Sequence, residues 1–160
     1  MIFVTVGTQL PFPRMIEAVV AWAKQHGRTD LFIQHAGYAA SLEGLPNSEF
    51  LDAATSARLM NEADLVVAHA GTGTILACLQ NGTPCIIVPR KASLGEHRND
   101  HQFATARRFE GRKGVFVVWD IADLPGILDR ADALDGSDGI NPFAEERLLQ
   151  AIRDFIDERD

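Results

Sequence analysis

Residues 65–88 read LVVAHAGTGTILACLQNGTPCIIV, and this order of residue types predicts a strand, a glycine-containing turn, a helix and a second strand. Leu65–His69 is a continuous apolar run, which is typical of a strand buried on both faces of a parallel sheet. Apolar residues then recur at helical spacing over about 72–81, and Gly82 stands where a glycine commonly ends a helix. A second buried strand is expected at Cys85–Val88. The stretch therefore predicts one β-α-β unit.

The rest of the chain continues the same alternation. Further strands are predicted at Ile2–Val6, Leu31–His35, Ser48–Leu51 and Val115–Val118, and further helices at about 12–25, 54–62, 99–110, 123–132 and 143–157. Strands that alternate with helices favour β/α units joined by right-handed crossovers. We therefore expect an α/β fold with a Rossmann-like, doubly wound parallel sheet.

The length fits one domain rather than several. The chain has 160 residues, of which 46% are apolar and 23% charged, an ordinary globular composition that excludes a disordered or collagen-like chain. We expect residues 1–134 to form the domain. Residues 135–160 are expected to be a linker and an amphipathic C-terminal helix that packs on the domain or docks a partner.

Charge is distributed unevenly along the sequence. The formal net charge is −7, yet residues 90–114 carry seven basic and three acidic groups. This pattern argues against general nucleic-acid binding and favours a local anion site, for a phosphate or an acidic lipid surface. A solvated, Arg- and Lys-bearing helix face is the alternative interpretation.

Two cysteines, Cys78 and Cys85, lie in apolar runs and indicate core positions in a reducing cytoplasm rather than a disulfide framework. The N-terminal residues lack the features of a signal peptide, and no apolar run approaches the ~20 residues that span a bilayer. Any membrane association is therefore expected through a partner or through the surface.

Two turns that follow predicted strands contain glycine. Gly7-Thr8 follows the first strand, and residues 69–74 (HAGTGT) lead into the helix at about 72–81. Ligands of such sheets bind at the carboxyl ends of the strands, and a helix N-terminus preceded by glycines suits a pyrophosphate. A tight turn with a threonine cap is the alternative. Neither a dinucleotide fingerprint nor a Walker A motif is present, because Leu76 stands where a third glycine is needed and no Gly-Lys-Ser/Thr follows.

A third polar segment, residues 90–102 (RKASLGEHRNDHQ), follows the strand at Cys85–Val88. Its density of hydrogen-bonding side chains suits sugar hydroxyls, although a polar helix start accounts for it as well. His97 and His101 are four residues apart, but no third ligand accompanies them, so no metal site is expected.

These motifs together, in the order Gly7-Thr8, HAGTGT, Asn81-Gly82-x-Pro84, Val88-Pro89-Arg90 and Asn99-Asp100-His101-Gln102, resemble a known family. Roughly residues 1–130 resemble the C-terminal, donor-binding half of the GT-B glycosyltransferases of family 28, to which MurG belongs. Stand-alone versions of this half are most similar: the catalytic subunit of the two-part N-acetylglucosaminyltransferase of dolichol-linked oligosaccharide synthesis, and bacterial exopolysaccharide proteins of the PssE/EpsF type.

The resemblance implies roles for individual residues. Gly7 and Thr8 would lie near the nucleotide phosphates, Leu51 near the uracil, and 71–74 around the pyrophosphate, while three polar residues of 99–102 would contact the donor sugar. Arg90, Glu96, His97 and Arg98 are typical of the bacterial subgroup. The candidate substrate-binding residues are Gly7, Thr8, Leu51, His69, Ala70, Gly71, Thr72, Gly73, Thr74, Arg90, Glu96, His97, Asn99, His101 and Gln102.

One position departs from the family pattern. Relatives of the MurG type carry a ribose-binding glutamate eight residues after the position of His69, and here that position is Ala77. The ribose contact is therefore absent or supplied elsewhere, with Glu96 as a candidate.

The resemblance implies the catalytic, donor-binding subunit of an inverting glycosyltransferase. It would transfer a sugar from a UDP-sugar to a polyprenyl-diphosphate-linked acceptor in exopolysaccharide synthesis, without a cofactor or metal. A single domain is half of a cleft, so a membrane-anchored, acceptor-binding partner subunit is expected to hold the protein at the inner, cytoplasmic face of the membrane. His69 and His101 are candidate general bases, but the family analogy places the base on the acceptor half.

Two other functions remain open from the sequence. The first is that of a non-catalytic nucleotide-sugar-binding or scaffolding subunit, and the alanine at position 77 favours it. The second is that of an enzyme resembling the UDP-sugar epimerases, although epimerase chemistry needs both halves of the fold.

Overall fold

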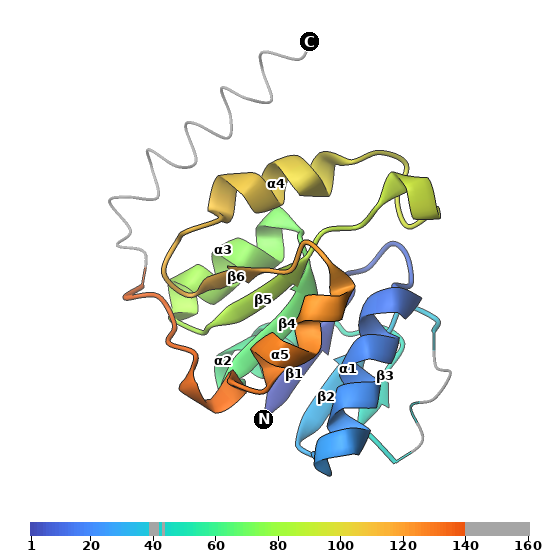
Figure 1. Ribbon diagram of the computed structural model, residues 1–160. Coiled ribbons are helices and arrows are strands. Elements are labelled where there is room, and N and C mark those ends of the chain that lie inside the picture. Colours follow the sequence, from blue (N-terminus) through green and yellow to red (C-terminus); the bar gives the residue numbers. More distant parts are fainter. Residues whose placement is uncertain (39–41, 43, 140–160) are drawn as a thin grey trace.

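The computed structural model describes residues 1–38, 42 and 44–139, which fold around one parallel sheet (Figure 1). Its strands are β1 (Ile2–Thr5), β2 (Leu31–Gln34), β3 (Asn47–Ser48), β4 (Leu65–His69), β5 (Cys85–Val88) and β6 (Val115–Val117). They lie in the order β3-β2-β1-β4-β5-β6, and every neighbouring pair is parallel. The predicted Rossmann-like, doubly wound α/β fold is confirmed.

Helices cover both faces of the sheet (Figure 1). They are α1 (Pro13–His26), α2 (Ala53–Glu62), α3 (Thr72–Asn81), α4 (His101–Phe109) and α5 (Leu124–Leu128). Side chains of α1 and α5 pack with one set of strand residues, and side chains of α2, α3 and α4 pack with the alternate set. Strand residues such as Phe3 and Val4 are fully buried on opposite faces, which explains why the strands are continuous apolar runs.

The strand order reverses beside β1, and this reversal decides where a ligand fits. β1 pairs with β2 on one side and with β4 on the other, so the chain winds in opposite directions from this point. The loops that leave β1 and β4 therefore separate and open a crevice at the carboxyl edge of the sheet.

Three predicted elements differ from the structure by more than one residue at an end. The third strand is Asn47–Ser48 rather than Ser48–Leu51, and α4 begins at His101, two residues later than expected. The helix predicted at 123–132 is broken into the 3-10 helix η2 (Ile121–Asp123), α5 and the 3-10 helix η3 (Ala131–Ala133).

The helix predicted at 143–157 lies outside the described residues. Within the described part of the chain, every helix is too short or too polar to cross a membrane.

Candidate functional site

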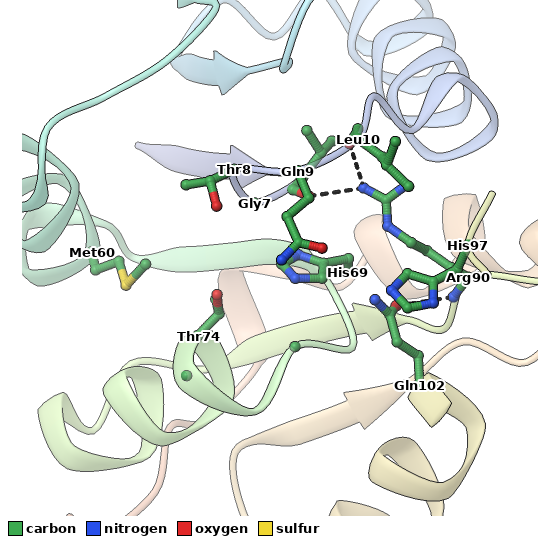
Figure 2. Close-up of a pocket in the computed structure, with 13 residues that line it drawn as sticks. Gly7, Thr8, Gln9, Leu10, Met60, His69, Thr74, Arg90, His97 and Gln102 are labelled. Atoms are coloured by element: carbon green, nitrogen blue, oxygen red, sulfur yellow. Dashed lines mark hydrogen bonds between the residues drawn. The ribbon is translucent and has the colours of Figure 1, made fainter. Parts of the chain in front are cut away.

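A cavity of about 450 Å³ opens at the carboxyl edge of the sheet, where the strand order reverses (Figure 2). It is lined by Val6, Gly7, Thr8, Gln9, Leu10, Met60, His69, Gly71, Gly73, Thr74, Arg90, His97 and Gln102. A smaller hollow of about 130 Å³ adjoins it, shares Gly7, Thr8, Met60 and Thr74 with it, and adds Thr5, Gln34, Leu51 and Ser56. The two spaces together form an elongated site along β1, α2 and α3.

The N-terminus of α3 forms one wall of the cavity. Gly71 precedes the helix in an extended conformation and no side chain caps it. The N–H of Gly71 donates to the carbonyl of His69 at 2.8 Å, whereas the N–H groups of Thr72, Gly73 and Thr74 have no hydrogen-bond partner among the described residues. Three unpaired donors at the positive end of a helix dipole form an anion-binding site.

Gly7 and Gly71 are required by the imidazole of His69. A Cβ atom at Gly7 would lie 2.7 Å from Cε1 of His69, and a Cβ atom at Gly71 would lie closer still to its Nε2. Gly7 also has φ of +79°, which disfavours other residues. The two turns that the sequence assigns to phosphate binding are thus glycine-containing partly because the His69 ring fills the space between them.

His69 is held neutral. Burial, and next the positive charge of Arg90, lower the pKa of His69 to about 4. At neutral pH the ring therefore adds no charge to the cavity, and it is a weak base for proton abstraction, because a general base works best with a pKa near the operating pH.

Gln34 fixes the loop that follows β1. Its side chain is buried, and Oε1 accepts from the hydroxyl of Thr5 at 2.8 Å and from the N–H of Val6 at 3.2 Å. Its Nε2 donates to the carbonyls of Gly7 at 3.0 Å and Glu49 at 2.9 Å. The amide therefore joins the β1 loop to the loop before α2, at the smaller hollow.

Arg90 fixes the same loop from the opposite side. Its side chain is only 2% exposed and lies over the Phe12 ring, 4.5 Å from the centroid. Nη2 donates to the carbonyls of Val6 and Leu10 at 2.9 and 2.6 Å, and Nη1 donates to those of Pro11 and Glu96 at 2.8 and 3.2 Å. Arg90 thereby holds the cavity-lining loop by its backbone.

The Glu96 carboxylate is committed to other groups. It accepts from Nε and Nη2 of Arg14 at 2.6 and 2.8 Å, and from the N–H of Lys91 at 2.8 Å. Hydrogen bonding to Arg14 and Lys91 keeps the pKa of Glu96 below its usual value, although burial opposes this effect. Glu96 lines neither space, so its position does not support the ribose contact that was a candidate role for it.

The structure brings together most of the residues predicted from sequence. Gly7, Thr8, His69, Gly71, Gly73, Thr74, Arg90, His97 and Gln102 line the main cavity, and Leu51 lines the adjoining hollow. Ala70 is buried, and Thr72, Asn99 and His101 are exposed, so that none of these four side chains lines either space.

Of two consecutive residues on α4, Gln102 lines the cavity and His101 does not. Gln102 is buried and its Oε1 accepts from the N–H of Arg90 at 3.1 Å, whereas His101 is exposed and its N–H donates to the side chain of Asn99 at 3.2 Å. Consecutive residues on a helix point about 100° apart, so only one of the two reaches the cavity. Within residues 1–38, 42 and 44–139, no three metal-ligating side chains gather into a metal site.

Sequence reasoning missed Gln9, Leu10, Met60, Gln34 and Ser56. Gln9 and Leu10 directly follow Gly7-Thr8, and their position in a loop after a strand was a usable signal. Met60 and Ser56 are on α2, and no local pattern indicates which face of that helix meets the β1 loop.

The parallel sheet and the reversal of strand order define a Rossmann-like domain, and its open helix N-terminus is suited to an anion. The chain belongs to the family described as the glycosyltransferase family 28 C-terminal domain, whose model matches residues 1–118.

Two curated proteins are similar in sequence. The UDP-N-acetylglucosamine transferase subunit ALG13 of Eremothecium gossypii is 29% identical over an alignment of 167 positions. The alignment covers 81% of this chain and 80% of that protein. The UDP-N-acetylglucosamine–N-acetylmuramyl-(pentapeptide) pyrophosphoryl-undecaprenol N-acetylglucosamine transferase of Opitutus terrae is 34% identical over 102 residues, 64% of this chain and 24% of that protein. This chain therefore spans most of the first relative and about a quarter of the second.

Solved structures show the same fold. The solution structure of ALG13 matches with a TM-score of 0.63 at 22% identity and covers 92% of this chain and 94% of that one. Acinetobacter baumannii MurG matches with a TM-score of 0.57 at 19% identity, over 82% of this chain and 42% of that one. The second match extends over less than half of the MurG chain.

Proposed function

We propose that this chain is the donor-binding, catalytic subunit of a two-component inverting glycosyltransferase, which transfers a sugar from a UDP-sugar to a polyprenyl-diphosphate-linked acceptor in exopolysaccharide synthesis. One observation carries the proposal: the α3 N-terminus, with unpaired N–H groups at Gly73 and Thr74, lines a cavity large enough for a nucleotide sugar. The names of both curated relatives, which specify UDP-N-acetylglucosamine transfer, support the choice of UDP.

The arrangement suggests how the leaving group is stabilised. When the acceptor hydroxyl attacks the anomeric carbon, negative charge develops on the departing diphosphate. Backbone donors already fixed at the α3 N-terminus stabilise that charge without reorganisation. Inversion follows from a single displacement, in which the acceptor attacks from the side opposite the diphosphate.

A partner subunit supplies the other half of the site in this proposal. The described residues form one domain, and the two histidine candidates are poor general bases: His69 has a pKa of about 4, and His101 is exposed and lines neither space. The word "subunit" in the name of the Eremothecium relative and "pyrophosphoryl-undecaprenol" in that of the Opitutus relative support a partner and a lipid-linked acceptor. We further propose that a membrane-anchored partner, which binds the acceptor and holds the base, places the chain at the inner, cytoplasmic face of the membrane.

A second candidate is a non-catalytic nucleotide-sugar-binding subunit. Ala77 favours it, because this α3 residue lacks the carboxylate that relatives of the MurG type use for the ribose and lines neither space.

Sugar transfer by the chain co-expressed with its partner tests the proposal and separates the two candidates. Gln102→Ala, which alters the cavity wall, should strongly reduce transfer, and His101→Ala, a neighbouring exposed position on α4, should leave it unchanged. Transfer at the wild-type rate by Gln102→Ala would support the non-catalytic role. A thermal-shift panel of UDP-sugars then identifies the donor, because a ligand stabilises the native state that binds it.

A further inference from the structure

Arg90 is an arginine buried without a carboxylate partner. Its two Nη atoms donate to four backbone carbonyls, and none of the ion pairs among the described residues includes it. The nearest acid, Glu96, directs its carboxylate at Arg14. A buried charge of this kind is costly unless something compensates for it.

The cavity beside Arg90 contains no compensating acid. Its described lining includes glycines, hydroxyls, amides, thioether and apolar groups and two imidazoles, but no carboxylate. His69 is neutral at pH 7, and Arg90 is the one side chain other than an imidazole that can carry a charge in that lining. A cation in a low-dielectric wall attracts an anion more strongly than the same cation in water.

The two Nη groups of Arg90 have no hydrogen left to donate to a ligand. An arginine carries two hydrogens on each Nη atom, and all four are directed at carbonyls of the β1 loop and of Glu96. Arg90 therefore acts through its charge and through the loop rather than as a direct phosphate ligand.

We propose that Arg90 is a positioning residue for the diphosphate of the donor: it fixes the Val6–Pro11 loop against the cavity and supplies an uncompensated positive charge that selects a diphosphate over a monophosphate. The inference rests on the proposed function and goes beyond it by assigning the source of charge selectivity to a residue that does not touch the ligand. The charged and titratable groups around it are Glu96 and Arg14 on one side and His69 and His97 in the cavity.

Burial lowers the pKa of Arg90 to about 10, against a smaller opposite effect of Glu96. A diphosphate favours the charged guanidinium, so the affinity for UDP should fall as the pH rises through about 10. Arg90→Lys keeps the charge at neutral pH, but burial lowers the pKa of a lysine from its ordinary ~10.4, so its affinity should fall at a lower pH.

Calorimetric titration of the purified chain with UMP and UDP tests the proposal. Arg90→Met should weaken UDP binding at least about tenfold and UMP binding less, because a second phosphate gains more from the charge. Arg28→Met is the matched control: Arg28 also lies over an aromatic ring, that of Trp22, but it pairs with Asp30 and Asp132 away from the cavity, so both affinities should be unchanged.

The variant Glu96→Gln should change the affinity for UDP in the direction opposite to Arg90→Met. It remains informative even if Arg90→Met fails to fold. Removing this negative charge leaves the cavity more positive, so UDP binding should tighten, whereas a merely structural role for the cluster requires it to weaken. Equal losses of UMP and UDP affinity in Arg90→Met, or weaker UDP binding by Glu96→Gln, would overturn the inference alone. Absence of UDP binding by the wild-type chain would instead remove the proposed function and this inference with it.

Discussion

Gly73→Ala separates ligand binding from stability more cleanly than any other single substitution at this site. Gly73 is the second residue of α3, lines the cavity, and has nothing within 4 Å of where a Cβ would lie. Its φ is not in the left-handed region, so alanine is accommodated without strain. Alanine has the higher helix propensity, and substitutions of this kind stabilise a protein by about 0.4–1 kcal/mol.

The same methyl group would stand among the N–H donors that face the ligand. Loss of one hydrogen bond to a charged group costs about 1.5–3 kcal/mol, or roughly 10- to 100-fold in affinity. At a UDP concentration of about 100 times the wild-type Kd, the ligand stabilises the native state by about 2.7 kcal/mol. With a Kd about 30-fold weaker, the same concentration stabilises the variant by only about 0.9 kcal/mol.

Thermal unfolding with and without UDP measures both effects. Without ligand, Gly73→Ala should unfold at the wild-type temperature or a few degrees above it, at about 2–4 °C per kcal/mol for a domain of this size. The control is Gly126→Ala in α5, another exposed glycine with free space around its Cβ that lines neither cavity, and its UDP-induced shift should equal that of the wild type. An undiminished shift in Gly73→Ala would show that the α3 N-terminus does not hold the phosphates.

Three further predictions concern the core of the site and the cysteines. Because the pKa of His69 is about 4 in the native state and ~6.5 when unfolded, the unfolded chain binds more protons in this window, so the free energy of unfolding should fall by up to about 3 kcal/mol as the pH drops from 6.5 to 4. Urea titrations across that range should show a shallower dependence in His69→Gln, and an unchanged slope would contradict the buried neutral ring. Gly71→Ala should destabilise the wild type by at least about 1 kcal/mol through its clash with His69 and much less in a His69→Ala background, and simple additivity in this double-mutant cycle would refute the clash. Cys78 and Cys85 are buried free thiols, and a hydrogen bond with Cys78 together with burial raises the pKa of Cys85, so a thiol reagent should label neither until the protein unfolds; rapid labelling of the native protein would place them elsewhere.

The sequence predicts the sheet well because each strand has both faces buried. Strands such as Cys85–Val88 are wholly apolar and end at turn residues, so their limits are visible locally. The region after β6 is different: it is held by contacts distant in sequence, such as the hydrogen bond from Nε1 of Trp22 to Asp129 at 2.8 Å. The sequence therefore predicts one helix at 123–132, whereas the structure has three short helical segments there.

Some parts of the candidate site can likewise be predicted from the sequence, and others cannot. The turn at 69–74 is predictable, because the strand, the glycines and the helix that position the donors are consecutive. The role of Arg90 is not predictable, because the carbonyls of Val6 and Leu10 that accept from it are separated from it by 84 and 80 residues. The sequence groups His101 with Gln102 as candidate sugar contacts, but only Gln102 lines the cavity, since a motif written as a string does not show which residue of a helix faces inward.

The positions of these groups suggest how the reaction is divided between two subunits. Everything that the described part of this chain contributes to the cavity is suited to an anion: the N–H groups at the α3 N-terminus, the charge of Arg90, and the loop that Arg90 and Gln34 fix. These donors are held by contacts within the chain, so the proposed function predicts that the nucleotide binds without a partner. Of the two histidines considered as bases, His69 has a lowered pKa and His101 is turned to solvent, whereas His97 lines the cavity beside His69. In the proposed two-subunit enzyme, a domain built this way would hold the leaving group, and the subunit that binds the acceptor would deprotonate it.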